Sequence, residues 1–276
     1  MRPGIIKRGV RGVMGLMLGT VLAAGVSAEA RACNIDIATF FKEHQGCFLL
    51  YNLTKNTYDM TYGGDFCDTR RSPASTFKIA NSLIALDLGI LKDEHTTYRW
   101  DGTKQFLPSW EHDKTLASAV KDSVVWYFQA VAKQVGTQQY QAYLKRFSYG
   151  NQDILGGLTT FWLGRSLTIS PKEQIAFLKA LYSNTLPVSK HAINTVKKIL
   201  ILESSARGTL SGKTGAASVD GFNIGWFVGH LASGDTEYLF ATNVTAKGTD
   251  YKINDAYAGL AAKAITKDIL SCQALF

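Results

Sequence analysis

A short stretch of the 276-residue chain reads Ser72-Pro73-Ala74-Ser75-Thr76-Phe77-Lys78. If it begins a helix, Ser75 and Lys78 lie on one face, because residues three apart are neighbours on a helix. A serine hydroxyl is a weak nucleophile until a nearby base takes its proton. A lysine one turn away can be that base only when its amine is neutral. The spacing therefore predicts acyl-transfer chemistry in which Lys78 is kept uncharged.

This serine–lysine pair is a weak signal by itself. Ser118-Ala119-Val120-Lys121 has the same spacing and is typical of an ordinary amphipathic helix. Lys213-Thr214-Gly215 follows far downstream, and other short segments stand in order around these features: Ser109-Trp110-Glu111, Ser123-Val124-Val125, Tyr149-Gly150-Asn151, Phe161-Trp162-Leu163-Gly164 and Gly225-Trp226-Phe227. Each segment alone is weak evidence, but the full set in this order is specific.

The ordered set resembles the class D β-lactamases, the oxacillinases. Serine β-lactamases and penicillin-binding proteins share a Ser-x-x-Lys, a Ser-Asp-Asn and a Lys-Thr-Gly. Here the middle element is instead a Ser-x-Val, at residues 123–125. The resemblance extends over essentially all of the chain after its N-terminal segment.

The resemblance implies three catalytic residues. Ser75 would attack the β-lactam carbonyl and form an acyl-enzyme, at the positive end of a helix dipole. Lys78, kept neutral by burial, would add carbon dioxide and act as a carbamate base for acylation and deacylation. Ser123 would hydrogen-bond this base and relay a proton to the lactam nitrogen. Taken singly, Ser75 could be a helix N-cap and Ser123 a structural serine.

An apolar pocket would surround the carbamate, and its members would be Phe77, Val125, Trp162 and Leu163. The indole N–H of Trp162 could donate a hydrogen bond to the carbamate. Plain core packing is the alternative for all four and is compatible with the role. No cofactor or metal is expected, only carbon dioxide or bicarbonate for Lys78.

The substrate-binding residues implied by the resemblance lie mostly on one strand: Lys213, Thr214, Gly215, Ala216 and, from another segment, Trp110. Lys213 would attract the substrate carboxylate, and Thr214 would hydrogen-bond it. Gly215 would let the backbone approach closely. The backbone N–H groups of Ser75 and Ala216 would form an oxyanion hole, worth about 3 kcal/mol per donor. A solvated strand lysine is the alternative for Lys213.

One departure concerns the substrate carboxylate. Many class D enzymes hold it with an arginine after the last strand, but this chain has no arginine after Arg207. We expect Asn254 or Lys252, within residues 247–255, to stand nearest, which leaves carboxylate binding mainly to Lys213 and Thr214. For Tyr149-Gly150-Asn151 we expect a mainly structural role.

The N-terminus is typical of a secretory signal peptide. Four basic residues, from Arg2 to Arg11, precede an apolar run over residues 13–26, and Val26-Ser27-Ala28 has the form of a cleavage site. Cleavage after Ala28 is favoured, with Ala30 and Ala32 as alternatives. The sequence thus predicts a signal at 1–28, a catalytic domain at 29–276, and a periplasmic protein without a stable membrane anchor, as a monomer or homodimer.

Charge and cysteine content narrow the function classes. Removing residues 1–28 lowers the net charge from +8 to +4, and no Lys/Arg cluster suggests nucleic-acid binding. The five histidines are scattered, which argues against a zinc site. Four cysteines in an exported chain allow three pairings. We favour Cys47–Cys67, whereas Cys33 and Cys272 either pair or stay buried thiols.

The order of elements predicts an α+β fold. β-Rich runs at 48–53 and 57–62 are followed by a largely helical stretch, including helices at 120–135 and 137–147. Strands at 209–217, 222–232 and 237–244 and a helix at 255–270 complete the chain. We expect one antiparallel sheet flanked by terminal helices, with the helical region inserted between early and late strands.

Three functions compete. The first is a secreted class D β-lactamase that hydrolyses penicillin- and oxacillin-type β-lactams. The second is a penicillin-binding or β-lactam-sensing domain that acylates but deacylates slowly. The third is a catalytically dead binding module, against which the intact Ser75, Lys78, Ser123 and Lys213 argue.

Overall fold

The computed structural model describes residues 1, 3–4, 33, 35–42, 44–246 and 255–276. From Cys33 on, these residues belong to one compact unit, Arg31–Phe276. The expected signal peptide falls almost wholly outside the described residues. Across the part that is described, no helix is both long and apolar enough to span a membrane.

Six antiparallel strands form the main sheet, in the order β2-β1-β8-β7-β6-β5. Their bounds are His44–Asn52 (β1), Thr57–Tyr62 (β2), Ile201–Ser204 (β5), Gly208–Val219 (β6), Phe222–Ser233 (β7) and Thr236–Ala246 (β8). The pairing of β1 with β8 joins early and late parts of the chain, so the predicted single sheet is confirmed. The short edge strand β5 was not predicted. A second, two-stranded sheet pairs Thr97–Tyr98 (β3) with Lys114–Thr115 (β4).

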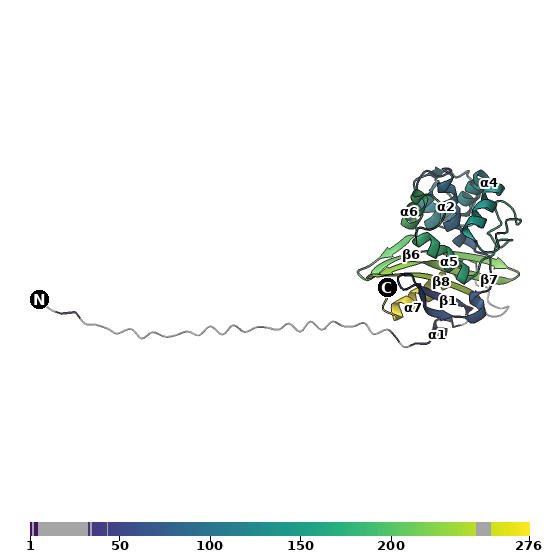
Figure 1. Cartoon of the computed structure of the whole chain (residues 1–276). Coiled ribbons are helices and arrows are strands. Elements are labelled where there is room, and N and C mark those ends of the chain that lie inside the picture. The colour runs from purple at the N-terminus through teal and green to yellow at the C-terminus, as the bar shows by residue number, and fades with distance from the viewer. Residues whose placement is uncertain (2, 5–32, 34, 43, 247–254) are drawn as a thin grey trace. The chain divides into compact units, whose positions relative to one another are not determined.

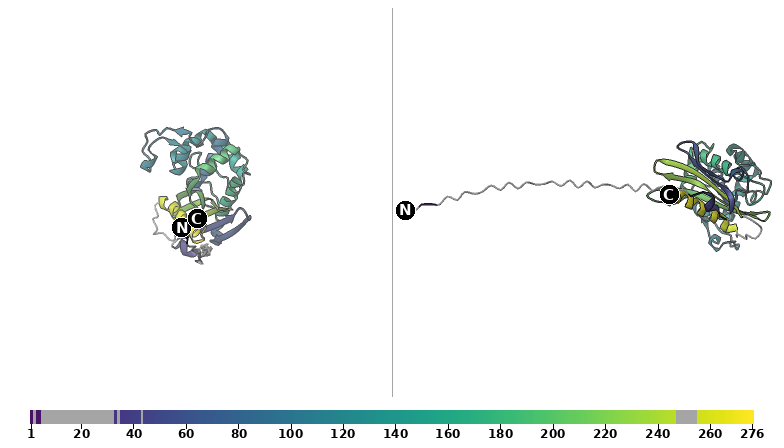
Figure 2. Two further views of the ribbon diagram at one scale, coloured as in Figure 1. Left: turned by 90° about the vertical axis from the view of Figure 1, so that its left-hand side faces the viewer. Right: turned by 90° about the horizontal axis from the view of Figure 1, so that it is seen from below.

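Helices cover both faces of the main sheet (Figure 1). On one face lie α1 (Ala38–Phe41) and α7 (Asp255–Cys272), the latter packed on β6, β7 and β8. On the other lie α2 (Lys78–Asp87), α3 (Leu116–Lys121), α4 (Val125–Phe147), α5 (Pro171–Tyr182) and α6 (Lys190–Ile199). Figure 2 shows the same layers from two further sides. The terminal helices and the inserted helical layer lie where the sequence predicted them.

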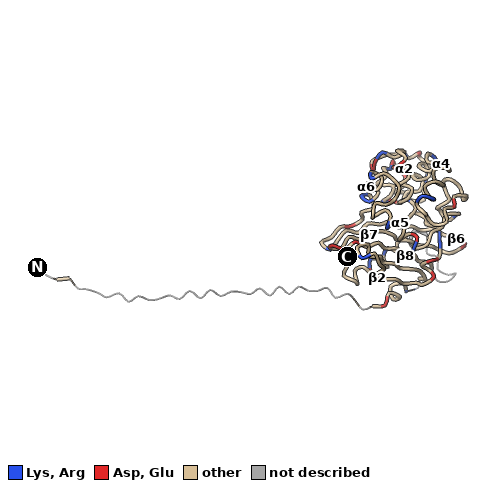
Figure 3. Tube along the Cα trace, viewed as in Figure 1, with Lys and Arg blue, Asp and Glu red and all other residues tan. Residues whose placement is uncertain are grey.

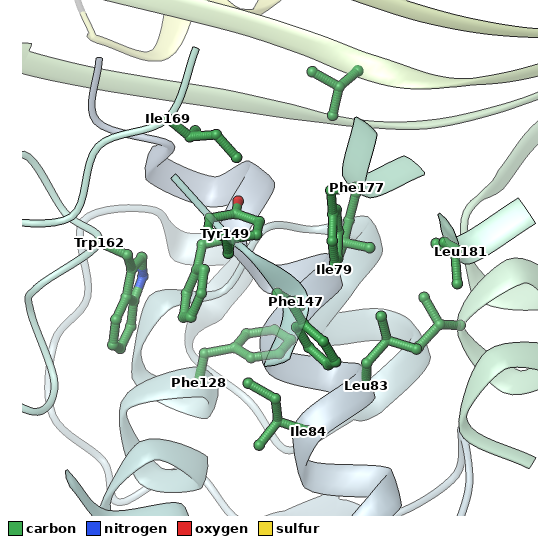
Figure 4. Packing of buried hydrophobic residues seen from close by; sticks show 14 of the residues in the cluster. Ile79, Leu83, Ile84, Phe128, Phe147, Tyr149, Trp162, Ile169, Phe177 and Leu181 are labelled. Atoms are coloured by element: carbon green, nitrogen blue, oxygen red, sulfur yellow. The ribbon is translucent and has the colours of Figure 1, made fainter. Parts of the chain in front are cut away.

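Side-chain alternation on the strands builds a core on each face. Phe48 and Leu50 of β1 belong to the core under α7, whereas Leu49 between them belongs to the core under the helical layer. Figure 4 shows the latter core, where Ile79 and Leu83 of α2 pack among aromatic side chains. Apolar residues on both sides of β1 therefore favour helices packed on each face of the sheet.

Local signals set the helix ends that matter for the site. Ser170 and Glu173 form the reciprocal capping box that opens α5. Gly136 breaks α4 with a φ of 77°, between the helices expected at 120–135 and 137–147. The helix expected at 120–135 was wrong at its start. α3 ends at Lys121, the chain turns at Ser123 with a φ of 60°, and α4 begins at Val125.

Both cysteine pairs are joined. Cys47 on β1 pairs with Cys67, at the end of a short 3₁₀ turn (Gly64–Cys67), as expected. Cys33 pairs with Cys272 at the end of α7, which settles the pairing that the sequence left open. The backbone N–H of Cys33 also donates to the Cys272 carbonyl at 2.8 Å. The two ends of the compact unit are thereby tied together.

Candidate active site

Ser75 lies in a 3₁₀ turn, Ala74–Phe77, that leads directly into α2, whose first residue is Lys78. Ala74 has a φ of 47°, a conformation that is rare for residues other than glycine. The Lys78 Nζ donates a hydrogen bond to the Ser75 Oγ at 2.8 Å. The predicted serine–lysine neighbours are therefore in direct contact.

The Lys78 side chain is completely buried. Burial holds the pKa of its amine well below the ordinary range, and the nearby charge of Lys213 adds to this lowering. Its Nζ lies 5.5 Å from the ring centre of Phe128. Phe128 was not foreseen as a neighbour of Lys78, since it lies 50 residues away along an ordinary helical pattern.

Aromatic side chains pack around this region (Figure 4). The rings of Phe77 and Trp162 are both fully buried, 5.6 Å apart between centres. The Trp162 Nε1 is buried and has no hydrogen-bond partner among the described residues. Val125 and Leu163, the other two predicted pocket members, are half-buried and line an open cleft.

Lys213 stands on β6 and is 4% exposed. Its Nζ donates to the Ser123 Oγ and to the Thr214 carbonyl, both at 3.0 Å. Burial, followed by the charge of Lys263, lowers the pKa of Lys213 to about 7. Ser123 was expected to bond the base at Lys78. The side-chain hydrogen bond that the structure shows for Ser123 is accepted from Lys213.

Ser123 is held in its left-handed turn by its neighbours. The Val124 N–H donates to the Ala119 carbonyl at 2.9 Å, which closes the turn. Lys114, fully buried, donates to an Asp122 carboxylate oxygen at 2.6 Å. The Trp110 indole donates to the Asp122 carbonyl at 2.9 Å. Lys114 could not be predicted from the sequence, because a lone lysine is usually exposed.

β6 meets the Ser75 turn at Gly215. A Cβ on Gly215 would lie 2.8 Å from the Pro73 carbonyl oxygen and 3.1 Å from the backbone N of Thr76. The close approach expected of this glycine is therefore made to the nucleophile turn. The pairing of β6 with β5 covers only 209–211, and the Gly212 N–H donates to the Leu200 carbonyl at 2.9 Å, so β6 has no partner in β5 beyond Gly212.

These elements enclose a cleft of about 320 Å³. Eight of the predicted site residues line it: Ser75, Trp110, Ser123, Val125, Leu163, Thr214, Gly215 and Ala216. Phe77, Lys78, Trp162 and Lys213 are buried and do not line it. Its other lining residues were not predicted: Phe106, Leu107, Asp122, Gly259 and Leu260.

The segment expected to replace the missing arginine, including Lys252 and Asn254, lies outside the described residues. The part of α7 that is described reaches the cleft through Gly259 and Leu260. Lys263, one turn further along α7, was missed. It is one of the charges that act on Lys213.

Loops behind the cleft are fastened by side chains. Asn151 donates to the Ser166 carbonyl at 2.8 Å and accepts from the Thr168 N–H at 2.9 Å, which fits its expected structural role. The Ser72 Oγ donates to the Trp162 carbonyl at 3.0 Å and accepts from the Gly164 N–H at 2.9 Å. The nucleophile turn is thus tied to the loop that carries Trp162.

The site can activate a serine and bind an anion. It offers a hydroxyl beside an amine of depressed pKa, a strand edge, and a second buried lysine. Within the described residues, no group of three His, Cys, Asp or Glu side chains could hold a metal ion.

Comparison with known proteins gives a consistent result. Residues 43–271 match the penicillin binding protein transpeptidase domain. The chain is 39% identical over 255 residues to the probable β-lactamase YbxI of Bacillus subtilis, covering 91% of each. The class D β-lactamase BAT-2 has a TM-score of 0.80 and 41% identity, covering 88% of this chain and 97% of that one. The C-terminal domain of the Bacillus licheniformis BlaR penicillin receptor has a TM-score of 0.81 and 35% identity, covering 88% and 96%.

Proposed function

The chain belongs to the class D serine β-lactamases, within the penicillin-binding-protein transpeptidase family, and we propose that it hydrolyses penicillin- and oxacillin-type β-lactams through a Ser75 acyl-enzyme. The observation that carries the proposal is the fully buried Lys78 amine, which donates to the Ser75 Oγ at 2.8 Å. A neutral amine at this distance can take the serine proton as Ser75 attacks the lactam carbonyl.

Residues in and beside the cleft complete the acylation step. The backbone N–H groups of Ser75 and Ala216 stabilise the developing oxyanion. Ser123, which accepts from Lys213, passes a proton to the lactam nitrogen as the ring opens. Lys213 and Thr214 hold the substrate carboxylate. Because the chain has no arginine after Arg207, carboxylate binding falls mainly on the buried Lys213. A lysine does not replace the bidentate contact that an arginine makes with a carboxylate.

Carboxylation of Lys78 by carbon dioxide is part of the proposal, and the surroundings of Lys78 fit the group. A depressed pKa supplies the neutral amine that carbon dioxide requires. The buried Trp162 Nε1 has no partner among the described residues, so it is available to donate to a carbamate oxygen. The carbamate would supply an anionic general base for both acylation and deacylation.

Trp162→Phe tests this fit, because it removes the indole N–H and keeps an aromatic ring in the core. A lost hydrogen bond to a charged group costs about 1.5–3 kcal/mol, so half-saturation should need at least about tenfold more bicarbonate. Turnover without added bicarbonate should fall accordingly and recover at high bicarbonate. Trp100→Phe is the control, since that indole bonds a loop carbonyl, that of Thr103. Equal bicarbonate dependence in all three proteins would contradict the carbamate.

The pH profile of kcat/KM tests the role of Lys213. Its pKa is about 7, so the ammonium is present below pH 7 and is lost as the pH rises above it. If only the charged form holds the substrate carboxylate, kcat/KM should fall above pH 7, approaching tenfold per unit. Lys213→Met should have low activity without this alkaline limb. A wild-type profile that stays flat from pH 6 to 9 would exclude the role.

A sensor-like function remains as the second candidate, because the BlaR penicillin-receptor domain is a close structural relative. A penicillin or oxacillin panel read by absorbance, together with intact mass spectrometry, separates the two. A β-lactamase shows repeated turnover and no lasting adduct. A single stoichiometric burst with a stable adduct on Ser75 would favour the sensor.

Export to the periplasm, with cleavage after Ala28, is proposed from the N-terminal pattern. The two cysteine pairs fit an oxidising compartment. Mass spectrometry of protein from the periplasmic fraction should find a chain that begins at Glu29. A full-length protein retained in the cytoplasm would reject the proposal.

A further inference from the structure

A small cavity, distinct from the catalytic cleft, lies where the segment before Ser75 meets the loop that follows Leu163. It has a volume of about 180 Å³ and shares no lining residue with the cleft. Three arginines line it: Arg70, Arg71 and Arg165. Figure 3 shows basic and acidic residues interspersed along the described chain, so this group of arginines is a local feature.

The positive charge in this cavity is only partly balanced. The Arg70 Nε donates to both carboxylate oxygens of Glu173 at 3.0 Å. Arg71 and Arg165 form no ion pair with any side chain that the structure describes. Asp220 is the one carboxylate among the described lining residues, and it too is outside these ion pairs. The cavity therefore favours an anion.

Arg71 has the clearest need of a partner. Its guanidinium carbon lies 5.8 Å from the ring centre of Phe66, and its Nε is buried with no hydrogen-bond partner among the described residues. Burial lowers the pKa of Arg71, and no described carboxylate offsets this effect. Buried polar and charged groups are normally paired, because leaving them without a partner is costly. An acceptor from outside the chain would complete the hydrogen bonding of Arg71.

The arginines and the size of the cavity indicate what that acceptor is. A guanidinium group favours phosphate, because its forked N–H groups bond two oxygens at once. The cavity is smaller than the about 300–1,000 Å³ of sites for drug-sized ligands, so it suits a single compact group. Phe222 borders it and is 59% exposed, which leaves an apolar surface beside the opening.

We propose that this cavity binds a phosphate group between Arg71 and Arg165, either free in solution or as the headgroup of a lipid. Arg71 directly precedes Ser72, whose Oγ bonds the Trp162 carbonyl and the Gly164 N–H. Arg165 belongs to the loop that carries Trp162, so the anion joins this loop to the nucleophile turn. Binding stabilises the folded protein and requires no β-lactam in the cleft.

Binding of inorganic phosphate to the purified protein tests the proposal without a β-lactam, so its failure leaves the proposed hydrolysis untouched. We expect one saturable site by isothermal titration calorimetry and a Tm that rises with phosphate. Sodium chloride at the same ionic strength is the control, because it screens charges without bridging two arginines. An equal rise of Tm in both salts would overturn the proposal.

Variants locate the site. Arg71→Gln and Arg165→Gln should each weaken phosphate binding at least about fivefold, and Arg71→Lys at least about threefold, because an ammonium lacks the fork. Arg165 is exposed, so its variant should fold as wild type. Arg99→Gln, at an exposed arginine outside the cavity, should bind phosphate as wild type does. If both glutamine variants of the cavity also bind as wild type, the anion is an adventitious surface ion and the proposal fails.

Vesicles of phosphatidylcholine, with and without phosphatidic acid, distinguish the two sources of the phosphate. Co-sedimentation that needs phosphatidic acid, and that Arg165→Gln and Phe222→Ser both weaken, assigns the phosphate to a lipid. Binding of inorganic phosphate without co-sedimentation assigns it to a soluble ligand. Binding of neither inorganic phosphate nor these vesicles would show that the cavity is not a phosphate site.

Discussion

Lys78→Ala is expected to reduce steady-state β-lactam turnover by about 10³-fold or more, because general base catalysis is typically worth 10²–10⁴-fold and here serves two steps. Ser75 loses the group that takes its proton, and the deacylating water loses its base. Adduct that does form should persist. Turnover by absorbance and intact mass after exposure to penicillin measure both effects.

Two further variants make the result specific. Lys78→Met fills a similar volume without a charge, so it should lose as much activity as Lys78→Ala. It should also unfold at a higher temperature than wild type, because it removes a buried amine, with a gain of about 0.5–2 kcal/mol. Lys145→Ala, on the exposed side of α4, should behave as wild type. If Lys78→Ala still deacylates rapidly, Lys78 is not the base.

Short ordered segments of the sequence predicted which residues would lie together. Ser75, Ser123 and Thr214 come from three distant segments and line one cleft, although only the order of the segments connected them. The two-layer placement of helices also followed from the order of β-rich and helical stretches. The periodicity of apolar residues and the order of the segments can both be read from a single sequence.

Contacts that depend on tertiary packing were not predictable. Phe128 beside Lys78 and Lys114 bonded to Asp122 are an ordinary helical aromatic and an isolated lysine in the sequence. The hydrogen bond from Lys213 to Ser123 was also not foreseen, because nothing local tells which lysine a turn will face. The break between α3 and α4 was missed because Ser123 adopts a positive φ that glycine usually supplies.

Gly215 joins the two halves of the cleft, because β6 touches the Ser75 turn there. On the other side of the strand, a Cβ on Gly259 of α7 would lie 2.9 Å from the Gly215 carbonyl oxygen. β6 is thus held between the nucleophile turn and α7, without room to move away from either. The relative position of the Ser75 and Ala216 backbone N–H groups depends on this contact.

Gly215→Ala should therefore lower kcat by about 10²-fold. Its Cβ would meet the Pro73 carbonyl oxygen at 2.8 Å, which is backbone and cannot rotate away, so the Ser75 turn must shift. A misplacement of about 1 Å costs roughly this much in rate. Overpacking should also lower the free energy of unfolding by about 1–3 kcal/mol, seen as a drop of several degrees in Tm. Ser218→Ala, an exposed position on the same strand, is the control. A Gly215→Ala enzyme with kcat within twofold of wild type would show that the oxyanion hole does not depend on this contact.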